Sequence, residues 1–187
     1  ASSFAMFAAG RAFEQVRNSI GYPHLNVKIG ATHAGISVGE DGASHQTFED
    51  LALMRTIPGM TVLNPSDGVS AAALIKQAVA FDGPAYIRLG RAAVPTFYTE
   101  EMAAKLEIGK AVCLRSGDKA DGNAADATVI ATGIMVNEAM LAAAELAADG
   151  IEVRVIDMHT IKPLDADLIY RAARETGAIV TAEEHSV

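Results

Sequence analysis

The spacing of hydrophobic residues predicts that the chain opens with an amphipathic helix. Apolar side chains recur at three- and four-residue intervals over residues 2–20, and Gly21-Tyr-Pro23 marks the end of this segment. A short strand is expected at Val27–Ala31. It leads into a loop over residues 33–45 that is rich in glycine and has almost no large apolar side chain.

A second helix is expected after this loop. It should begin near Ser44 or Thr47, because Thr47-Phe-Glu-Asp50 approximates a capping box that satisfies free backbone amides. Pro58-Gly59 should end it. We expect the helix to bury five apolar residues, namely Phe48, Leu51, Leu53, Met54 and Ile57.

The rest of the first half alternates between strand and helix. Strands are predicted at Thr61–Leu63 and Ala85–Leu89, with a capped turn at Asn64-Pro-Ser-Asp67 and a helix at Val69–Phe81 between them. A strand, a helix and a strand in succession indicate parallel pairing, because the helix returns the chain to the starting edge of the sheet.

The second half repeats this alternation after a stretch without clear periodicity. Strand, helix, strand, helix and strand are predicted in turn at residues 128–132, 137–148, 152–157, 166–175 and 178–182. The predicted fold class is therefore α/β, with two three-layer α/β/α units that each contain a mostly parallel sheet. We place the two domains at residues 1–104 and 105–187, and both ends of the chain suggest a piece of something longer.

Composition and charge restrict the class of protein. Half of the 187 residues are hydrophobic and 20% are charged, so the chain can form packed cores. No apolar run approaches the roughly 18 residues of a membrane-spanning helix. The net charge of −8 disfavours nucleic acids and anionic lipid surfaces. We therefore expect neither a nucleic-acid partner nor a membrane partner.

Several polar or reactive residues are expected to be structural. Cys113 is the single cysteine and lies in an apolar stretch, so we expect a buried thiol and a reducing, cytoplasmic setting. His24 and His159 are expected at solvated loop positions, and Glu183-Glu-His185 is assigned no chemistry.

The residues best suited to chemistry lie on the glycine-rich loop. His33, Asp41 and His45 can hold hydroxyl or phosphate groups, and the glycines between them let the backbone approach a ligand closely. A loop that ends a strand and precedes a helix lies at the carboxyl edge of a parallel sheet, where such sheets bind ligands. At a helix start, the imidazole of His45 should stay neutral and able to exchange a proton.

Two other interpretations fit these residues. They can simply cap the helix and solvate a turn. They can also bind a metal ion, although their spacing matches no compact ligand motif and no second cysteine is available. We expect no metal ion at this loop.

Longer motifs around the loop resemble the transketolase family. The pyrimidine-binding domain of transketolases is similar to Gly39-Glu-Asp-Gly-Ala-Ser-His-Gln46 and to Pro58-Gly-Met-Thr-Val-Leu-Asn-Pro-Ser-Asp67. Residues 107–187 resemble the C-terminal domain of the same enzymes. Ala-Gly after His33 and Ala-Ser before His45 resemble the split form, in which separate subunits supply the two halves of the enzyme.

The resemblance implies an activity, its cofactors and its partners. Transketolases transfer a two-carbon ketol unit from a ketose phosphate to an aldose phosphate with thiamine diphosphate, and Mg²⁺ binds mainly on a partner domain. The chain lacks the Gly-Asp-Gly motif of that domain, and the family's catalytic glutamate precedes the matched region. We therefore expect a chain that is inactive alone and assembles with an N-terminal, diphosphate-binding subunit into a dimer or heterotetramer.

The resemblance also assigns roles in cofactor binding and proton transfer. Phe4 and Phe7 match the aromatic residues that pack on the cofactor's aminopyrimidine, although ordinary helix packing is the alternative for both. His45 matches the histidine that handles the hydroxyl proton as the donor breaks or the acceptor adds.

Three further residues match groups that bind the substrate. Asp41 would bind a substrate hydroxyl, and His33 and Arg91 would bind the sugar phosphate. The planar guanidinium of Arg91 is well suited to phosphate, because it can make paired hydrogen bonds. A surface ion pair is the alternative for Arg91. Arg88 ranks second as a phosphate ligand, because it shares a face with Arg91 only if a bulge intervenes.

Two classes of function remain as alternatives to a transketolase of carbohydrate metabolism and the pentose phosphate pathway. The chain can belong to another thiamine-diphosphate enzyme, such as a deoxyxylulose-phosphate synthase or a pyruvate dehydrogenase beta-type subunit. The pair His45-Gln46 argues against both. It can also be a catalytically inactive, transketolase-like assembly or regulatory subunit.

Overall fold

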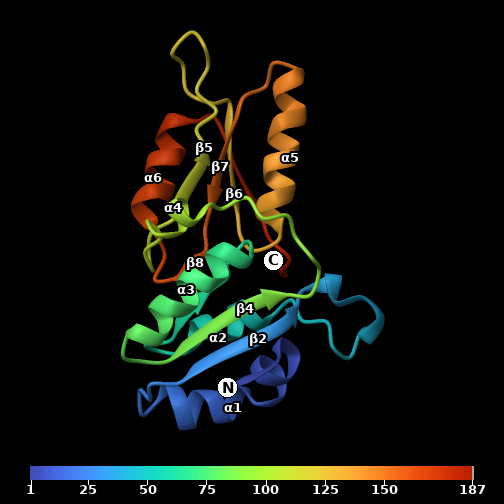
Figure 1. Cartoon of the computed structure of the whole chain (residues 1–187), viewed down its shortest axis with the longest axis vertical. Helices are drawn as coiled ribbons and strands as arrows, with labels where there is room; N and C mark the ends of the chain where they lie inside the picture. The colour runs from blue at the N-terminus through green and yellow to red at the C-terminus, as the bar shows by residue number, and fades with distance from the viewer. Residues whose placement is uncertain (187) are drawn as a thin grey trace.

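The chain folds into two β-sheets, each enclosed between helices (Figure 1). The computed structural model describes residues 1–186. The N-terminal unit occupies the lower half of Figure 1 and the C-terminal unit the upper half. Within the described part of the chain, no helix is both long and apolar enough to cross a membrane.

The first sheet contains five strands in the order β1-β2-β4-β3-β8. The first four pair in parallel, and β8 pairs antiparallel with β3. The bounds are Ser2–Phe4 (β1), Lys28–Ala34 (β2), Thr61–Leu63 (β3), Ala85–Gly90 (β4) and Thr160–Lys162 (β8). The carboxyl ends of four parallel strands therefore meet at one edge, where a ligand site is expected.

Helices cover both faces of this sheet. Successive residues of a strand point to opposite faces, so Val62 and Leu63 pack in different cores. One face is covered by η1 (Met6–Arg11), α1 (Phe13–Gln15), η2 (Val16–Gly21) and α2 (Asp50–Thr56), and the other by α3 (Gly68–Ala80) and α4 (Glu100–Ala103). Asp67 caps α3 in a reciprocal bond pair with Ser70, which confirms the predicted capped turn.

The second sheet has the strand order β5-β7-β6-β9. Strands β6, β7 and β9 are parallel, and β5 is antiparallel to β7. Helices α5 and α6 cover opposite faces of this sheet (Figure 1). The bounds are Val112–Arg115 (β5), Ala127–Ala131 (β6), Met135–Ala148 (α5), Val153–Asp157 (β7), Ala166–Glu175 (α6) and Ile179–Ala182 (β9). The predicted α/β class with two mostly parallel sheets is confirmed.

Strand β8 joins the two units, because it lies in the second half of the sequence and in the first sheet. Nothing in the local sequence predicts it. Its three residues, followed by Pro163, are too few to show the alternation of a strand, and the strand that it pairs with lies about a hundred residues earlier. The domain boundary near residue 105 stays a prediction.

Two local predictions near the N-terminus are wrong. Residues 2–4 pair with β2 as a strand instead of starting the helix. Helix α2 begins at Asp50, later than predicted, and its N-cap residue Glu49 makes no side-chain cap bond. Phe48 therefore precedes the helix and is 40% exposed, and Leu53 is only partly buried.

The environments predicted for Cys113 and His159 are also wrong. Cys113 is exposed, because it lies on β5 at the edge of the second sheet. His159 is fully buried between β7 and β8, and burial lowers the pKa of its imidazole to about 4. Its Nδ1 lies 3.0 Å from the Thr160 hydroxyl. His24 is exposed in a turn, as predicted.

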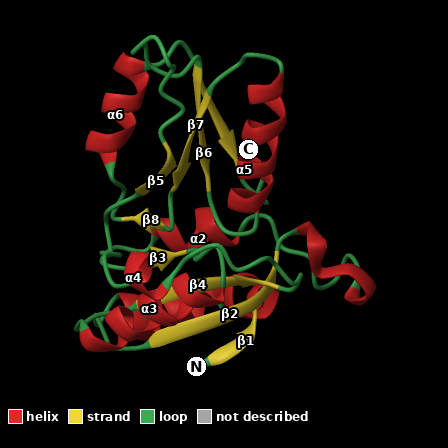
Figure 2. Ribbon diagram, turned by 45° about the horizontal axis from the view of Figure 1, so that its top comes forward, coloured by secondary structure: helices red, strands yellow, loops and turns green. Residues whose placement is uncertain are grey.

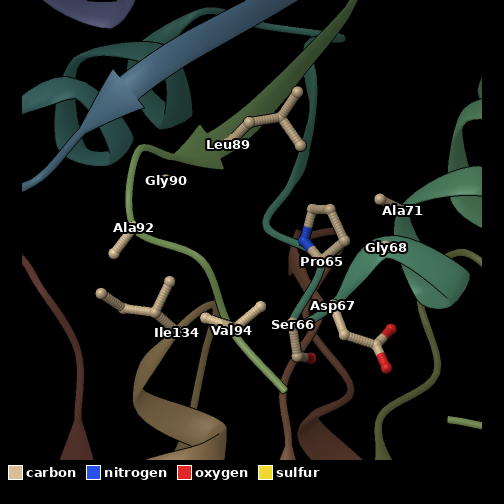
Figure 3. A pocket seen from close by; sticks show the side chains of 10 residues that line it. All are labelled: Pro65, Ser66, Asp67, Gly68, Ala71, Leu89, Gly90, Ala92, Val94 and Ile134. Carbon is tan, nitrogen blue, oxygen red and sulfur yellow. The ribbon is translucent and has the colours of Figure 1, made fainter. Parts of the chain in front are cut away.

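A small cavity lies where the two units meet (Figure 3). Its volume is about 150 Å³, and it is lined by Ser66 and Asp67 of the first unit and by Ile134 of the second. The Asp67 carboxylate already accepts hydrogen bonds from the backbone amides of Ser70, Phe97 and Tyr98. This cavity therefore offers no unused charged group to a ligand.

Asp157 forms a buried polar contact between the units. The hydroxyls of Ser66 and Tyr98 both donate to Asp157 Oδ2, the second at 2.8 Å. Burial raises the pKa of the Asp157 carboxyl to about 7. The folded state thus binds a proton that the unfolded state releases near pH 4.

This raised pKa predicts the pH dependence of stability. Between about pH 4 and 7 the folded state binds more protons through Asp157 than the unfolded state does. The contribution of Asp157 to the free energy of unfolding therefore falls as pH rises, by up to about 1.4 kcal/mol per pH unit. The lowered pKa of His159 makes the free energy of unfolding rise with pH instead. The effect of Asp157 is therefore isolated by comparing the wild type with Asp157→Asn in urea unfolding at several pH values. If the free energy of unfolding changed with pH by the same amount in the two proteins, the prediction would be wrong.

Candidate active site

Two phenylalanines and two histidines cluster at the carboxyl edge of the first sheet. The ring centroid of Phe4 lies 4.3 Å from that of His33 and 5.2 Å from that of His45. The ring of Phe7 lies 5.1 Å from His45 and 6.0 Å from Phe4. All four contacts are edge-to-face, and all four side chains are partly buried. The structure thus brings together four of the site residues expected from the sequence.

His33 lies on a distortion of β2. The pairing of β2 with β4 shifts register between Ala31 and Ala34, and His33 has a φ of 60°. Non-glycine residues rarely adopt positive φ, and both this strain and strand bulges are frequent next to active sites. Within residues 1–186 the buried Nδ1 of His33 has no hydrogen-bond partner. This nitrogen therefore lacks the hydrogen bond that a buried polar atom usually makes.

His45 lies in a turn and not at a helix start. Its backbone N–H donates to Gly42 O at 3.0 Å, whereas α2 begins only at Asp50. The prediction that a helix terminus holds its imidazole neutral is therefore wrong. The hydroxyl of Ser44 lies 2.9 Å from His45 Nδ1, which leaves Nε2 as the ring nitrogen that can face a ligand.

The segment between the two histidines projects from the body of the protein, at the right of Figures 1 and 2. It contains the short helix η3 (Ile36–Asp41). Gly35 at its start has a φ of 90°, a region open to glycine and strained for other residues. Gly35 N donates to Thr47 O at 2.8 Å, so the two ends of the segment are joined. We call residues 35–48 the substrate loop, after the role that we propose for it below.

Asp41 and Arg91 meet on this loop. Ala34 pairs with Gly90 at the end of β4, which places Arg91 beside the start of the loop. Arg91 Nη2 donates to Glu40 Oε2 at 3.2 Å, and its Nε lies 4.0 Å from Asp41 Oδ2. The surface ion pair is therefore present, but its partners are 37% and 91% exposed. Such pairs contribute roughly 0–1 kcal/mol, so the guanidinium can exchange Glu40 for another anion.

Arg88, the second-ranked phosphate ligand, is buried and bonded to groups of the protein core. Its Nε donates to Asp50 Oδ2 at 3.0 Å, and its Nη2 donates to Glu184 O at 2.7 Å. Tyr86 OH donates to the same Asp50 oxygen at 2.8 Å, and burial together with this carboxylate raises the pKa of Tyr86 well above its usual value. Arg88 therefore holds the scaffold behind the site and is closed to a substrate.

Two family models match the chain, one for each unit. The model "Transketolase, pyrimidine binding domain" matches residues 1–97, and "Transketolase, C-terminal domain" matches residues 117–187. The chain belongs to the transketolase family. Members of this family depend on thiamine diphosphate.

Relatives of this transketolase-family chain include proteins that are named as transketolase subunits. The 6-deoxy-6-sulfo-D-fructose transketolase subunit SqwH of Clostridium sp. (strain MSTE9) is 44% identical over 99% of the chain and 55% of its own length. A subunit of the apulose-4-phosphate transketolase of Phocaeicola vulgatus is 41% identical over 97% of the chain and 56% of its own length. The chain thus spans about half the length of these curated relatives.

A solved structure supports the same assignment. It is described as a split-gene transketolase in an inactive beta4 tetramer, and it is 51% identical to the chain with a TM-score of 0.87. The match covers 100% of this chain and 57% of the other. Among residues 1–186, no group of three or more histidine, cysteine, aspartate or glutamate side chains is arranged for a metal ion.

Proposed function

We propose that the chain is the C-terminal part of a split, thiamine-diphosphate-dependent transketolase. It would transfer a two-carbon ketol unit from a ketose phosphate to an aldose phosphate, together with a separate diphosphate-binding subunit. The observation that carries this proposal is the cluster of Phe4, Phe7, His33 and His45 at the carboxyl edge of a pyrimidine-domain sheet. Relatives that are named as subunits support the split arrangement.

The aromatic part of the cluster suits one face of the cofactor. Phe4 and Phe7 are partly buried and present ring surface, which fits the flat aminopyrimidine, and the unpartnered Nδ1 of His33 lies beside them. When bound, thiamine diphosphate supplies the electron sink for cleavage of the ketose carbon–carbon bond. We assign its diphosphate and Mg²⁺ to the partner subunit.

The polar residues of the loop suit the sugar. His45 Nε2 takes or gives the hydroxyl proton beside the reacting carbons, because an imidazole nitrogen can both accept and donate a proton. Asp41 accepts a hydrogen bond from a sugar hydroxyl. His33 and Arg91 hold the terminal anionic group of the substrate.

Activity with a complementary subunit tests this proposal. The chain, in its full-length form, is mixed with the diphosphate-binding subunit, thiamine diphosphate and Mg²⁺, and is offered ketose phosphates, 6-deoxy-6-sulfo-D-fructose and pyruvate. We expect ketol transfer from an anionic ketose by the mixture and none by the chain alone. Decarboxylation of pyruvate would favour a dehydrogenase-type subunit, and no turnover of any donor would favour an assembly or regulatory subunit.

The role of Arg91 gives a prediction about substrate affinity. Arg91→Ala should raise KM for phosphorylated sugars by roughly tenfold or more and leave unphosphorylated ketoses unaffected, because only phosphate binding is removed. Steady-state kinetics with matched sugars, with and without phosphate, measure the difference. Equal losses on both sugars would contradict the assignment.

A further inference from the structure

Residues 184–186 lie across both ends of the substrate loop. At the first end, Glu184 Oε1 accepts a hydrogen bond from Ser37 N at 2.5 Å. At the second end, Ser186 N donates to Phe48 O at 2.7 Å. This C-terminal segment, as we call residues 184–186, follows shortly after β9 and so belongs to the second unit. The loop of one unit is therefore held by a segment of the other.

The contact between Glu184 and the loop is tight. A Cβ atom added to Gly35 would collide with the Glu184 carboxyl group. Glu184 is only 8% exposed, although glutamate is rarely buried without a specific partner. The carboxylate thus fills the space beneath the start of the loop, and glycine at position 35 leaves room for it.

The backbone of the C-terminal segment is fixed by buried groups. Arg88 Nη2 donates to Glu184 O and its Nε pairs with the fully buried Asp50. His185 Nε2 accepts hydrogen bonds from Leu51 N at 3.2 Å and Ala52 N at 3.4 Å, at the start of α2. The segment is anchored on the scaffold of the first unit, so the position of the Glu184 carboxylate is well defined.

Two polar atoms at this contact have no protein partner within the described residues, Glu184 Oε2 and Ser37 Oγ. Burying a carboxylate with one free oxygen costs free energy. The packing of the second unit gives no reason for this charge, because the hydrogen bond of the Glu184 side chain goes to the loop of the first unit. What the carboxylate does is bind the loop.

We propose that Glu184 is a positioning residue that fixes the substrate loop, and that the C-terminal unit acts on the active site through it. The loop carries Asp41 and His45, which would contact the sugar, whereas Phe4 and Phe7 lie outside it. Misplacement of catalytic groups by about 1 Å can lower rates a hundredfold. The consequence for catalysis rests on the proposed function, but the contact itself does not.

Kinetics of the assembled enzyme test the consequence for catalysis. Glu184→Ala removes the acceptor of the Ser37 amide and should lower kcat/KM for the ketose phosphate by about tenfold to a hundredfold. Glu184→Gln keeps an acceptor oxygen of the same reach and should stay within about threefold of the wild type. The neighbouring, exposed Glu183→Ala is the matched control and should change nothing. The affinity for thiamine diphosphate should be unchanged in all three variants.

Hydrogen exchange of the chain tests the contact without any assay of activity. Glu184→Ala should speed amide exchange over residues 35–48, with the rest of the first sheet unchanged, and Glu184→Gln should not. If the wild-type mixture shows no ketol transfer, the proposed function fails while the exchange result still tests the contact. The inference would be overturned if Glu184→Ala had the amide exchange rates and kcat/KM of the wild type. It would also be overturned if Glu184→Ala and Glu184→Gln lowered kcat/KM equally.

Discussion

Replacing His45 by alanine should lower kcat of the assembled enzyme by roughly two to four orders of magnitude, the range for a positioned proton-transfer group. His45 packs against Phe4 and Phe7, and Ser44 occupies its Nδ1. In the proposed function, Nε2 is then the atom that exchanges a proton with the sugar hydroxyl. The measurement is turnover of a ketose phosphate at saturating donor and acceptor.

The control for this variant is another histidine that lies on the surface. His24 is exposed in a turn at the other end of the first helical stretch, and His24→Asn should leave kcat within about twofold. Thermal unfolding should be similar for both variants, because neither side chain is fully buried. Turnover by His45→Ala at the wild-type rate would remove this residue from the mechanism.

Replacing Asp50 by alanine should destabilise the chain by about 3–5 kcal/mol, the usual cost of leaving a buried charge without its partner. Asp50 is fully buried and accepts hydrogen bonds from Tyr86 OH and from Arg88 Nε. Without its carboxylate, the Arg88 guanidinium stays buried and unneutralised. Urea unfolding of the wild type and the variant measures the change.

An exposed ion pair of the same length provides the control. Lys105 and Glu101 are also 3.0 Å apart, but their side chains are 73% and 83% exposed. Glu101→Ala should therefore cost at most about 0.5 kcal/mol. Similar losses in Asp50→Ala and Glu101→Ala would show that burial does not govern the strength of the Arg88 pair.

Elements with strong local signals could be predicted from the sequence. Helix α6 occupies the predicted range Ala166–Glu175, because Asp165 caps its first turn and its apolar residues repeat on one face. Strand β3 and helix α3 follow the same logic, with Asp67 as the cap. In each case the deciding interactions lie within a few residues of one another.

Elements that depend on distant partners could not be predicted locally. Phe4 fits the apolar spacing of a helix, yet residues 2–4 are a strand because β2 offers them an open edge. His159 stands in a polar stretch, and only the pairing of β8 with β3 shows that the two units bury it. The sequence predicts a helix start near Ser44 or Thr47 because Thr47-Phe-Glu-Asp50 approximates a capping box, yet α2 begins only at Asp50.

The candidate site shows the same division. The loop residues and Arg91 could be selected because a long motif resembles a known family, and the structure shows how strand ends bring them to one edge. Glu184 could not be selected from the sequence. Its partner is a backbone amide 147 residues away, and every residue except proline has such an amide. The only signal is a polar stretch, Glu183-Glu-His185, without an evident partner.

A crystal structure of the assembled enzyme with a bound ketose phosphate tests the central claim most directly. We predict that the pyrimidine ring lies on Phe4 and Phe7, the reacting carbons lie beside His45 Nε2, and the phosphate contacts Arg91 and His33. A sugar bound away from the substrate loop, or a pyrimidine ring out of contact with both phenylalanines, would contradict it.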